Sequence, residues 1–379
     1  MLHIIKKLSP DQRRYVLLAS VVAIVLGALL LLNDTETGLA KKAEISTSEK
    51  TQTIEEKAKL YPRAREIVNP SGFLNTGGKE ITIEEYIGDK VLLVDFWTYS
   101  CINCQRTQPY LNSWYEKYKD DGLLIVGIHT PEFEFEKVTE NVAAAAEKYG
   151  VKYPIVQDND YGTWAAYQNR YWPRKYIIDI DGFIVYDHIG EGGYEETELV
   201  IQKLLSERAE RLGEVFSETE TVNPKMAESV SVGFQRTPEI YFGSQRNGEY
   251  LGNGTPSKLG TQEFVPPDTL QKNKVYLDGS WSISGEYAQN TEKGARIVIP
   301  YTAQKVFLVM GSDEEREVHV FVDGQSVNSE SRGAHVSEDG SVRVRKEMLY
   351  RLIEQDKHGS ELLELKVEPG VRAFAFTFG

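Results

Sequence analysis

Cysteine is nearly absent from this sequence: its 379 residues include only Cys101 and Cys104. Two cysteines cannot build the network of disulfides that holds many small secreted domains together, so the fold does not depend on such cross-links. Histidine is also scarce, and its positions show no ligand spacing among themselves or toward the cysteines. The six are His3, His129, His188, His319, His335 and His358. We therefore expect no metal site and no bound cofactor.

Positive charge is in deficit. Lys and Arg number 43 against 57 Asp and Glu, which leaves a formal charge of −14, and no cluster of basic residues offers a local exception. This balance excludes nucleic acid as an expected partner, because phosphate binding requires a basic surface. The length is sufficient for two domains and a tail, each domain with its own core.

A long hydrophobic run occurs near the N-terminus. Residues 15–32 carry no charge and are rich in Leu, Val and Ala, which is just long enough for a helix that spans a bilayer. Basic residues precede the run and acidic residues follow it. We expect residues 1–14 to be a short cytoplasmic segment, 15–32 a single-pass transmembrane anchor in the cell membrane, and the rest extracytoplasmic. A signal peptide cleaved near Ala40 is the alternative.

The next two segments differ in texture. Residues 33–61 are polar and read as a linker. Residues 62–212 alternate strand and helix patterns, which predicts an α/β domain. Apolar strands are expected at 91–96 and 123–128, and Asp181-Gly182 is a hairpin signal. Helices are expected at 105–119, within 131–149 and at 195–211.

After a second polar linker at 213–231, residues 232–379 lose helical periodicity. Short alternating apolar runs separated by turn signals such as Asp323-Gly324 and Pro369-Gly370 take its place. This pattern predicts an all-β sandwich, jelly-roll-like in architecture. One helical turn is expected at 348–355.

The two cysteines stand where the apolar strand 91–96 meets the predicted helix 105–119. Free N–H groups and the helix dipole at such a junction favour a thiolate on Cys101. A spacing of three residues places both sulfurs near one face of the first turn, close enough to bridge. The sequence therefore predicts a pair that forms and breaks a disulfide.

Three polar residues are candidates for supporting roles. Asp95 lies inside the apolar strand, where burial raises the pKa of a carboxyl and suits it to take the proton of the second thiol. An edge carboxylate in water or a structural acceptor is the alternative. His129 and Glu132 follow the next strand; we expect a solvated loop there, with lining of a substrate groove as the alternative.

Several motifs together resemble the thioredoxin superfamily: Val94-Asp95-Phe96-Trp97, the CxxC pair, Pro109, and a proline that opens a late strand. The extra helix expected around 136–149 resembles the insert of membrane-anchored TlpA-type proteins. The stretches 97–104, 127–133 and 153–156 resemble the extracytoplasmic part of DipZ-type thiol-disulfide oxidoreductases. In DipZ-type proteins a carbohydrate-binding-module-like β-sandwich follows, and residues 277–281 and 376–379 resemble it.

The resemblance implies roles for five residues. Cys101 would be the attacking nucleophile and Cys104 the resolving thiol of a redox-active disulfide. Asp95 would be the buried acid. Pro173 would be a cis-proline facing the cysteines, and Trp172 before it would line the substrate groove.

The resemblance also implies partners. The clients would be protein thiols and disulfides. DipZ-type proteins carry a multi-span domain that imports electrons, whereas this chain shows a single hydrophobic run and no third cysteine. A separate membrane electron donor of the CcdA/DsbD type is therefore implied for a reductase. Ile102-Asn103 differs from the Gly-Pro of thioredoxin, so the redox poise of thioredoxin does not transfer.

Two other functions compete. The Thr98-x-x-Cys101 spacing resembles peroxiredoxins and suggests a thiol peroxidase. Alternatively, the β-sandwich is the main module of a surface protein that contacts cell-wall polysaccharide or another protein. Its candidate sugar-stacking aromatics more often fill a core. They are Trp281, Tyr276, Tyr287 and Tyr241.

Overall fold

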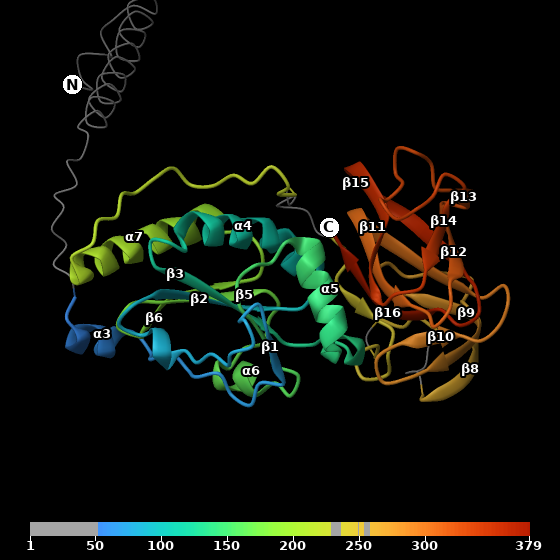
Figure 1. Cartoon of the computed structure of the whole chain (residues 1–379). Helices are drawn as coiled ribbons and strands as arrows, with labels where there is room; N and C mark the ends of the chain where they lie inside the picture. Colours follow the sequence, from blue (N-terminus) through green and yellow to red (C-terminus); the bar gives the residue numbers. More distant parts are fainter. Residues whose placement is uncertain (1–51, 229–235, 249, 254–257) are drawn as a thin grey trace, which may run out of the picture. The chain divides into compact units, whose positions relative to one another are not determined.

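The computed structural model describes residues 52–228, 236–248, 250–253 and 258–379. The expected membrane anchor at 15–32 and most of the first linker lie outside these residues. Among the residues that are described, no helix is both long and apolar enough to cross a membrane. Two sheets organise this part of the chain, one in an α/β region and one in a C-terminal β region (Figure 1).

The α/β region contains a six-stranded mixed sheet in the order β1-β4-β3-β2-β5-β6. The central strand β2 pairs in parallel with β3 and antiparallel with β5. The predicted strands at 91–96 and 123–128 and the predicted hairpin are confirmed. The strands are β1 (Gly72–Leu74), β2 (Val91–Trp97), β3 (Leu123–His129), β4 (Ile155–Gln157), β5 (Arg174–Ile178) and β6 (Ile184–Ile189).

Strand β2 is buried along its whole length, as a near-continuous apolar run in a sheet covered on both faces requires. Leu93 and Trp97 share a core with α4 (Ile102–Tyr118) and α7 (Tyr194–Leu212). Phe96 belongs to a second core, beside Trp164 of α6 (Gly162–Ala166). Figure 1 shows α4 and α7 on one side of this sheet and α6 on the other. Because side chains alternate along a strand, Asp95 faces the same side as Leu93 and Trp97, toward α4.

The helix expected within 131–149 occupies the second half of that segment. A 3-10 turn, η2 (Glu134–Lys137), precedes α5 (Thr139–Tyr149), and Gly150 ends α5 with a left-handed φ of 68°. A left-handed residue at that position is the usual way to close a helix. A second 3-10 turn, η1 (Glu84–Tyr86), precedes β2.

All strand pairs of the C-terminal β region are antiparallel, as the sequence predicts. The long strand β11 pairs with β9 through its first residues and with β16 through its last, so the sheet folds back over one large core. The strands are β7 (Ile240–Tyr241), β8 (Gly260–Phe264), β9 (Tyr276–Ile283), β10 (Ala288–Asn290), β11 (Arg296–Gly311), β12 (Arg316–Val322), β13 (Gln325–Ser326), β14 (Ser341–Val344), β15 (Met348–Val367) and β16 (Arg372–Phe378).

The helical turn expected at 348–355 is wrong, because these residues form the start of β15. Leu349, Leu352 and Ile353 have the spacing of a helix face. They are nevertheless buried in a strand whose register against β11 shifts between Val306 and Phe307. The shift inserts an extra residue on β15 and breaks the alternation that would have identified a strand.

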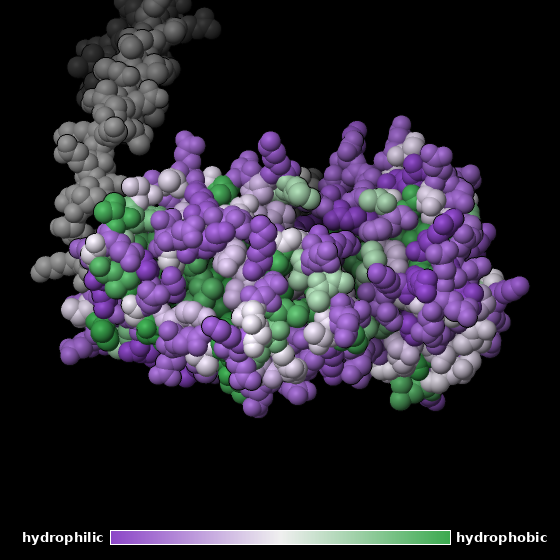
Figure 2. Space-filling view, in the orientation of Figure 1, coloured by the Kyte–Doolittle hydropathy of each residue, from purple (hydrophilic) through white to green (hydrophobic). Residues whose placement is uncertain are grey.

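The exposed surface is predominantly hydrophilic in the face that Figure 2 presents, with hydrophobic residues in small groups. This distribution agrees with the excess of acidic residues in the sequence.

A short helix, α3 (Ile54–Leu60), is fastened to the α/β region by one lysine. Lys57 is 3% exposed, and its Nζ lies 2.8 Å from Asp179 Oδ2 and 2.9 Å from Asp181 Oδ2. Glu207 of α7 also pairs with this amine. Buried charges of this kind require partners, so α3 and the three carboxylates depend on one another.

Replacing Lys57 with Met should therefore lower the free energy of unfolding by about 3 kcal/mol, because buried carboxylates lose their counter-charge. Urea denaturation at neutral pH measures this loss. Lys59→Met, at an exposed position of the same helix, is the control and should stay within about 0.5 kcal/mol of the parent. Equal losses in the two variants would contradict the role of Lys57.

Candidate active site

Both cysteines lie at the junction of β2 and α4. Cys101 is the N-cap of α4 with extended backbone, and Cys104 lies in the first turn. Cys101 is half-buried, whereas Cys104 is 1% exposed, and both are free thiols. Another protein can therefore reach Cys101, while Cys104 is accessible to its neighbours within the fold.

The Trp172–Pro173 segment lies against Cys101. The Trp172–Pro173 peptide bond is cis, and Cys101 Sγ lies 3.9 Å from the carbonyl oxygen of Trp172, to which the thiol donates. The indole Nε1 of Trp172 donates to the carbonyl of Thr130 at 3.0 Å, which fixes the ring beside the end of β3. The structure thus brings together three of the residues singled out from the sequence.

Asp95 is completely buried, as its apolar neighbours in the sequence predict. Among the described residues neither carboxylate oxygen has a hydrogen-bond partner. Burial raises the pKa of Asp95 to about 7, and the charge of Lys175 opposes the shift. Burial, the contact with Cys101 and the charge of Asp95 all raise the pKa of Cys104 well above its usual value. Asp95 and Cys104 are therefore two buried acids close enough for the ionisation of one to raise the pKa of the other.

Lys175 belongs to the candidate site, although the sequence patterns did not single it out. It is the cross-strand neighbour of Asp95 on β5, it is fully buried, and its Nζ donates to the carbonyl of Gly190 at 3.2 Å. Burial lowers its pKa, and the negative charge of Asp95 opposes this change. A lysine inside the buried strand that follows Pro173 was the available signal. A buried acid and a buried base side by side can hold a proton close to the thiols.

Glu136 of η2 is a second missed residue, and it anchors the loop that leads into Cys101. Its Oε1 accepts from the backbone N–H of Ser100 at 3.2 Å and from the Ser100 hydroxyl at 2.7 Å. Its Oε2 accepts from the backbone N–H groups of Glu132 at 2.6 Å and Phe133 at 3.0 Å. Burial and the charge of Glu132 raise the pKa of Glu136 to about 7. The sequence gives no local signal that distinguishes it from the nearby glutamates.

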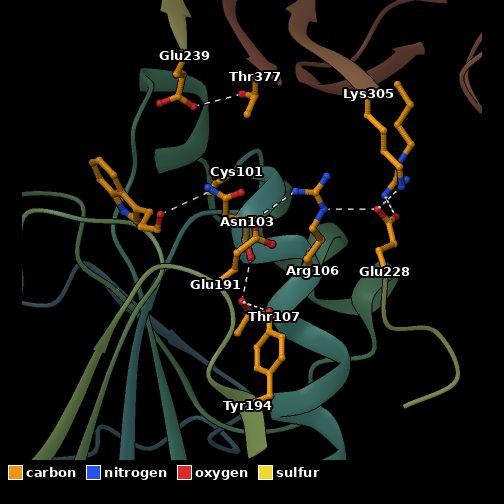
Figure 3. Close-up of polar contacts among 12 residues, drawn as sticks. Cys101, Asn103, Arg106, Thr107, Glu191, Tyr194, Glu228, Glu239, Lys305 and Thr377 are labelled. Atoms are coloured by element: carbon orange, nitrogen blue, oxygen red, sulfur yellow. Dashed lines mark hydrogen bonds and ion pairs between the residues drawn. The ribbon is translucent and has the colours of Figure 1, made fainter. Parts of the chain in front are cut away.

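Polar contacts also brace the first turns of α4 (Figure 3). The Thr107 hydroxyl donates to the carbonyl of Asn103 at 2.9 Å. Arg106, 5% exposed, pairs with Glu191 at 3.3 Å and with Glu228 at 3.5 Å. Glu228 belongs to the predicted second linker, so the start of the active-site helix is tied to two other parts of the chain.

The solvated loop expected at His129 and Glu132 is wrong for both residues. His129 is fully buried, its ring is stacked on Tyr99, and burial lowers its pKa to about 3. Glu132 Oε1 accepts from the Tyr241 hydroxyl at 2.7 Å and from Arg246 at 2.9 Å, both in the C-terminal β region. Contacts distant in sequence thus remove these groups from water.

One cluster of carboxylates has the spacing of a metal site within the described part of the chain: Asp179, Asp181 and Glu207. The amine of Lys57 binds all three of these carboxylates. The cluster contains neither cysteine. A cation already supplied by the chain thus accounts for it.

Comparison with known proteins follows the same division of the chain. Residues 63–187 match the AhpC/TSA family, and residues 237–379 match the thioredoxin-like C-terminal domain family. The chain is 36% identical over 310 residues to the protein DipZ of Mycobacterium tuberculosis, a match that covers 82% of this chain and 42% of DipZ. The chain therefore spans less than half of the length of that relative.

Two shorter relatives are covered more fully. The thiol-disulfide oxidoreductase YkuV of Bacillus subtilis is 30% identical over 149 residues, which are 39% of this chain and 98% of YkuV. The thiol-disulfide oxidoreductase ResA of Bacillus cereus is 32% identical over 127 residues, which are 34% of this chain and 70% of ResA.

Replacing Glu136 with Gln should lower the free energy of unfolding by about 1–3 kcal/mol, because all four partners of the carboxylate are donors and an amide NH2 would face at least one of them. Thermal or urea denaturation at pH 8, above the pKa of Glu136 near 7, measures the loss for the ionised form. Glu134→Gln, an exposed position of the same turn, is the control. A loss no larger than that of the control would contradict the anchoring role.

Proposed function

Because the chain belongs to the thioredoxin-like thiol-disulfide oxidoreductases, we propose that it exchanges disulfides with secreted or membrane client proteins through Cys101 and Cys104. One arrangement carries the proposal. A half-buried thiol at a helix N-terminus lies 3.9 Å from the carbonyl oxygen of Trp172, and a buried thiol lies one turn further on beside a buried carboxylate. The first thiol suits attack on an external disulfide and the second suits resolution.

The reduction of a client disulfide takes two steps. The thiolate of Cys101 attacks one client sulfur, a mixed disulfide forms, and the second client sulfur leaves as a thiolate that takes up a proton. Cys104 then loses its proton and attacks Cys101 Sγ, which releases the first client sulfur. Two electrons pass to the client, and the protein is left with a Cys101–Cys104 disulfide.

Asp95 is the proposed proton acceptor for Cys104. A carboxyl with a pKa of about 7 can take and return a proton near neutral pH, which an ordinary aspartate does poorly. Lys175 makes the ionised form of Asp95 tolerable in a buried strand. The role proposed for Asp95 thus rests on its burial, which raises its pKa, and that of Lys175 on its positive charge, which opposes this rise.

The proposed direction is reduction, with the protein held in the cell membrane by residues 15–32 and its bulk extracytoplasmic. The described residues contain no cysteine besides the pair, so a separate membrane electron donor of the CcdA/DsbD type would return the two electrons. Protein thiols and disulfides outside the cytoplasm would be the clients.

A thiol peroxidase is the second candidate, and the match of residues 63–187 to the AhpC/TSA family favours it. The same segment contains the Thr98-x-x-Cys101 spacing. Thr98 is buried. Consumption of hydrogen peroxide by the purified protein, compared with its reduction of a protein disulfide, separates the two activities.

Sugar binding by the C-terminal β region receives no support from the candidate aromatics. Trp281 and Tyr276 are fully buried in that region, which confirms the core interpretation for both. Tyr241 donates its hydroxyl to Glu132, and Tyr287 packs on Phe374. These rings therefore do not form an open face for a polysaccharide.

Replacing Cys104 with Ser should trap the client, because the mixed disulfide on Cys101 can no longer be resolved. We expect disulfide-linked adducts on non-reducing gels with Cys104→Ser, and their loss on addition of dithiothreitol. Cys101→Ser is the matched control. It should form no adducts, because the one thiol that remains, Cys104, is buried and cannot reach a client. Adducts of equal yield with both variants would contradict the assigned roles.

The rate of resolution should rise with pH through about 7 in the parent protein, because Asp95 accepts a proton only when ionised. Asp95→Asn should remove that rise and slow the step by about 10²-fold or more at pH 8. Single-turnover release of a client from the mixed disulfide measures the rate. Asp120→Asn, at an exposed position, is the control; an unchanged pH profile in Asp95→Asn would rule out proton transfer through this carboxyl.

A further inference from the structure

The residue between the cysteines is covered by the C-terminal β region. Ile102 is 1% exposed and belongs to one buried cluster with residues of that region. We name it the docking cluster. Its members are Ile102, Phe133, Phe307, Val309, Leu349, Phe374 and Ala375.

Aromatic contacts extend the docking cluster to the turn η2. Phe374 of β16 lies edge-on to Phe133 and to Phe135, with ring centroids 5.2 Å and 4.9 Å apart. The guanidinium of Arg106 lies 5.5 Å from the ring centroid of Phe307. The β region therefore contacts the active-site helix and the turn that anchors the loop before Cys101.

A polar rim adjoins the docking cluster. Arg246 binds Glu132 at 2.9 Å and lies over the ring of Tyr241 at 3.7 Å. The backbone N–H of Glu134 donates to Glu286 at 3.0 Å. An apolar centre with a polar edge is the composition of a specific interface, so this contact has the features of a built one.

We propose that the C-terminal β region forms one wall of the client-binding surface and restricts exchange to extended chain segments, which enter along Trp172 and Pro173. The inference rests on the disulfide exchange proposed above and names its substrate class. The β region contacts Ile102, the residue directly after the attacking Cys101. The second boundary is Trp172, whose carbonyl oxygen lies 3.9 Å from Cys101 Sγ.

The two boundaries select by size. An extended segment requires a layer about 10 Å thick, the distance between packed sheets. A folded domain of about 100 residues has a radius of gyration near 13 Å, so it is wider than such a layer. On this proposal the bulk of a folded domain meets the docked β region before its sulfur reaches Cys101, whereas an extended segment passes beside it.

One peptide of about a dozen residues, with its cysteine joined to glutathione, tests the inference in two forms. It is offered free, and as a surface loop of a folded carrier domain, to the full-length reduced protein. We expect the free form to react about tenfold faster or more than the form in the carrier domain. Because the same thiols attack both forms, the ratio cancels their intrinsic reactivity.

Ile102→Ala should lower this ratio several-fold, because the side chain that holds the wall is shortened. Asn103→Ala is the matched control: it also changes the dipeptide between the cysteines, but its side chain is outside the docking cluster, so the ratio should not change. Arg246→Gln weakens the rim without touching the dipeptide. It should lower the ratio while the reduction potential of the pair stays that of the parent.

Arg296→Gln, whose partners Asp278 and Glu364 lie within the β region, controls for general loosening of that region and should leave the ratio unchanged. A ratio near one in the parent protein would overturn the inference. A high ratio that neither Ile102→Ala nor Arg246→Gln lowers would overturn the assignment of the wall. Absence of exchange with either form would instead refute the proposed function, and the inference with it.

Discussion

The burial of Asp95 in the middle of β2 is the constraint on which the α/β region depends. A carboxylate in a dry strand costs several kcal/mol unless a counter-charge lies nearby. Lys175 supplies that charge from β5. Because side chains alternate along β2, Asp95 faces the helix that carries the cysteines. The pairing of β2 with β5 places Lys175 beside Asp95, and the packing of α4 on β2 places Cys104 near the same carboxyl, whose charge raises the pKa of Cys104.

The loop before Cys101 shows how the rest of the chain is organised around that arrangement. Glu136 holds the loop from inside the α/β region, and Glu132, two residues from the same turn's start, binds the C-terminal β region. A single short turn therefore serves the active site on one side and the second region on the other. The match to DipZ covers 82% of this chain, so it includes parts of both regions.

Local patterns were enough to predict much of the fold. The apolar run of β2, the Asp181-Gly182 turn and the long periodic helix α7 each carry their signal within a few residues. The cysteine pair and the buried Asp95 are equally local features. Lys175, Glu136 and Ile102 escaped prediction because their roles arise from contacts made by distant parts of the chain. The start of β15 was misassigned for a related reason, since pairing with β11 overrides its helix-like spacing.

The attachment of α3 has a geometric consequence. Lys57 grips Asp179 and Asp181, which follow β5, and β5 runs antiparallel to β2 so that its end lies beside the beginning of β2. The cysteines follow the opposite end of β2. The attachment of α3 therefore lies at the end of the sheet where β2 begins, remote from Cys101. The full length of β2 thus separates the attachment of α3 from the reactive thiol.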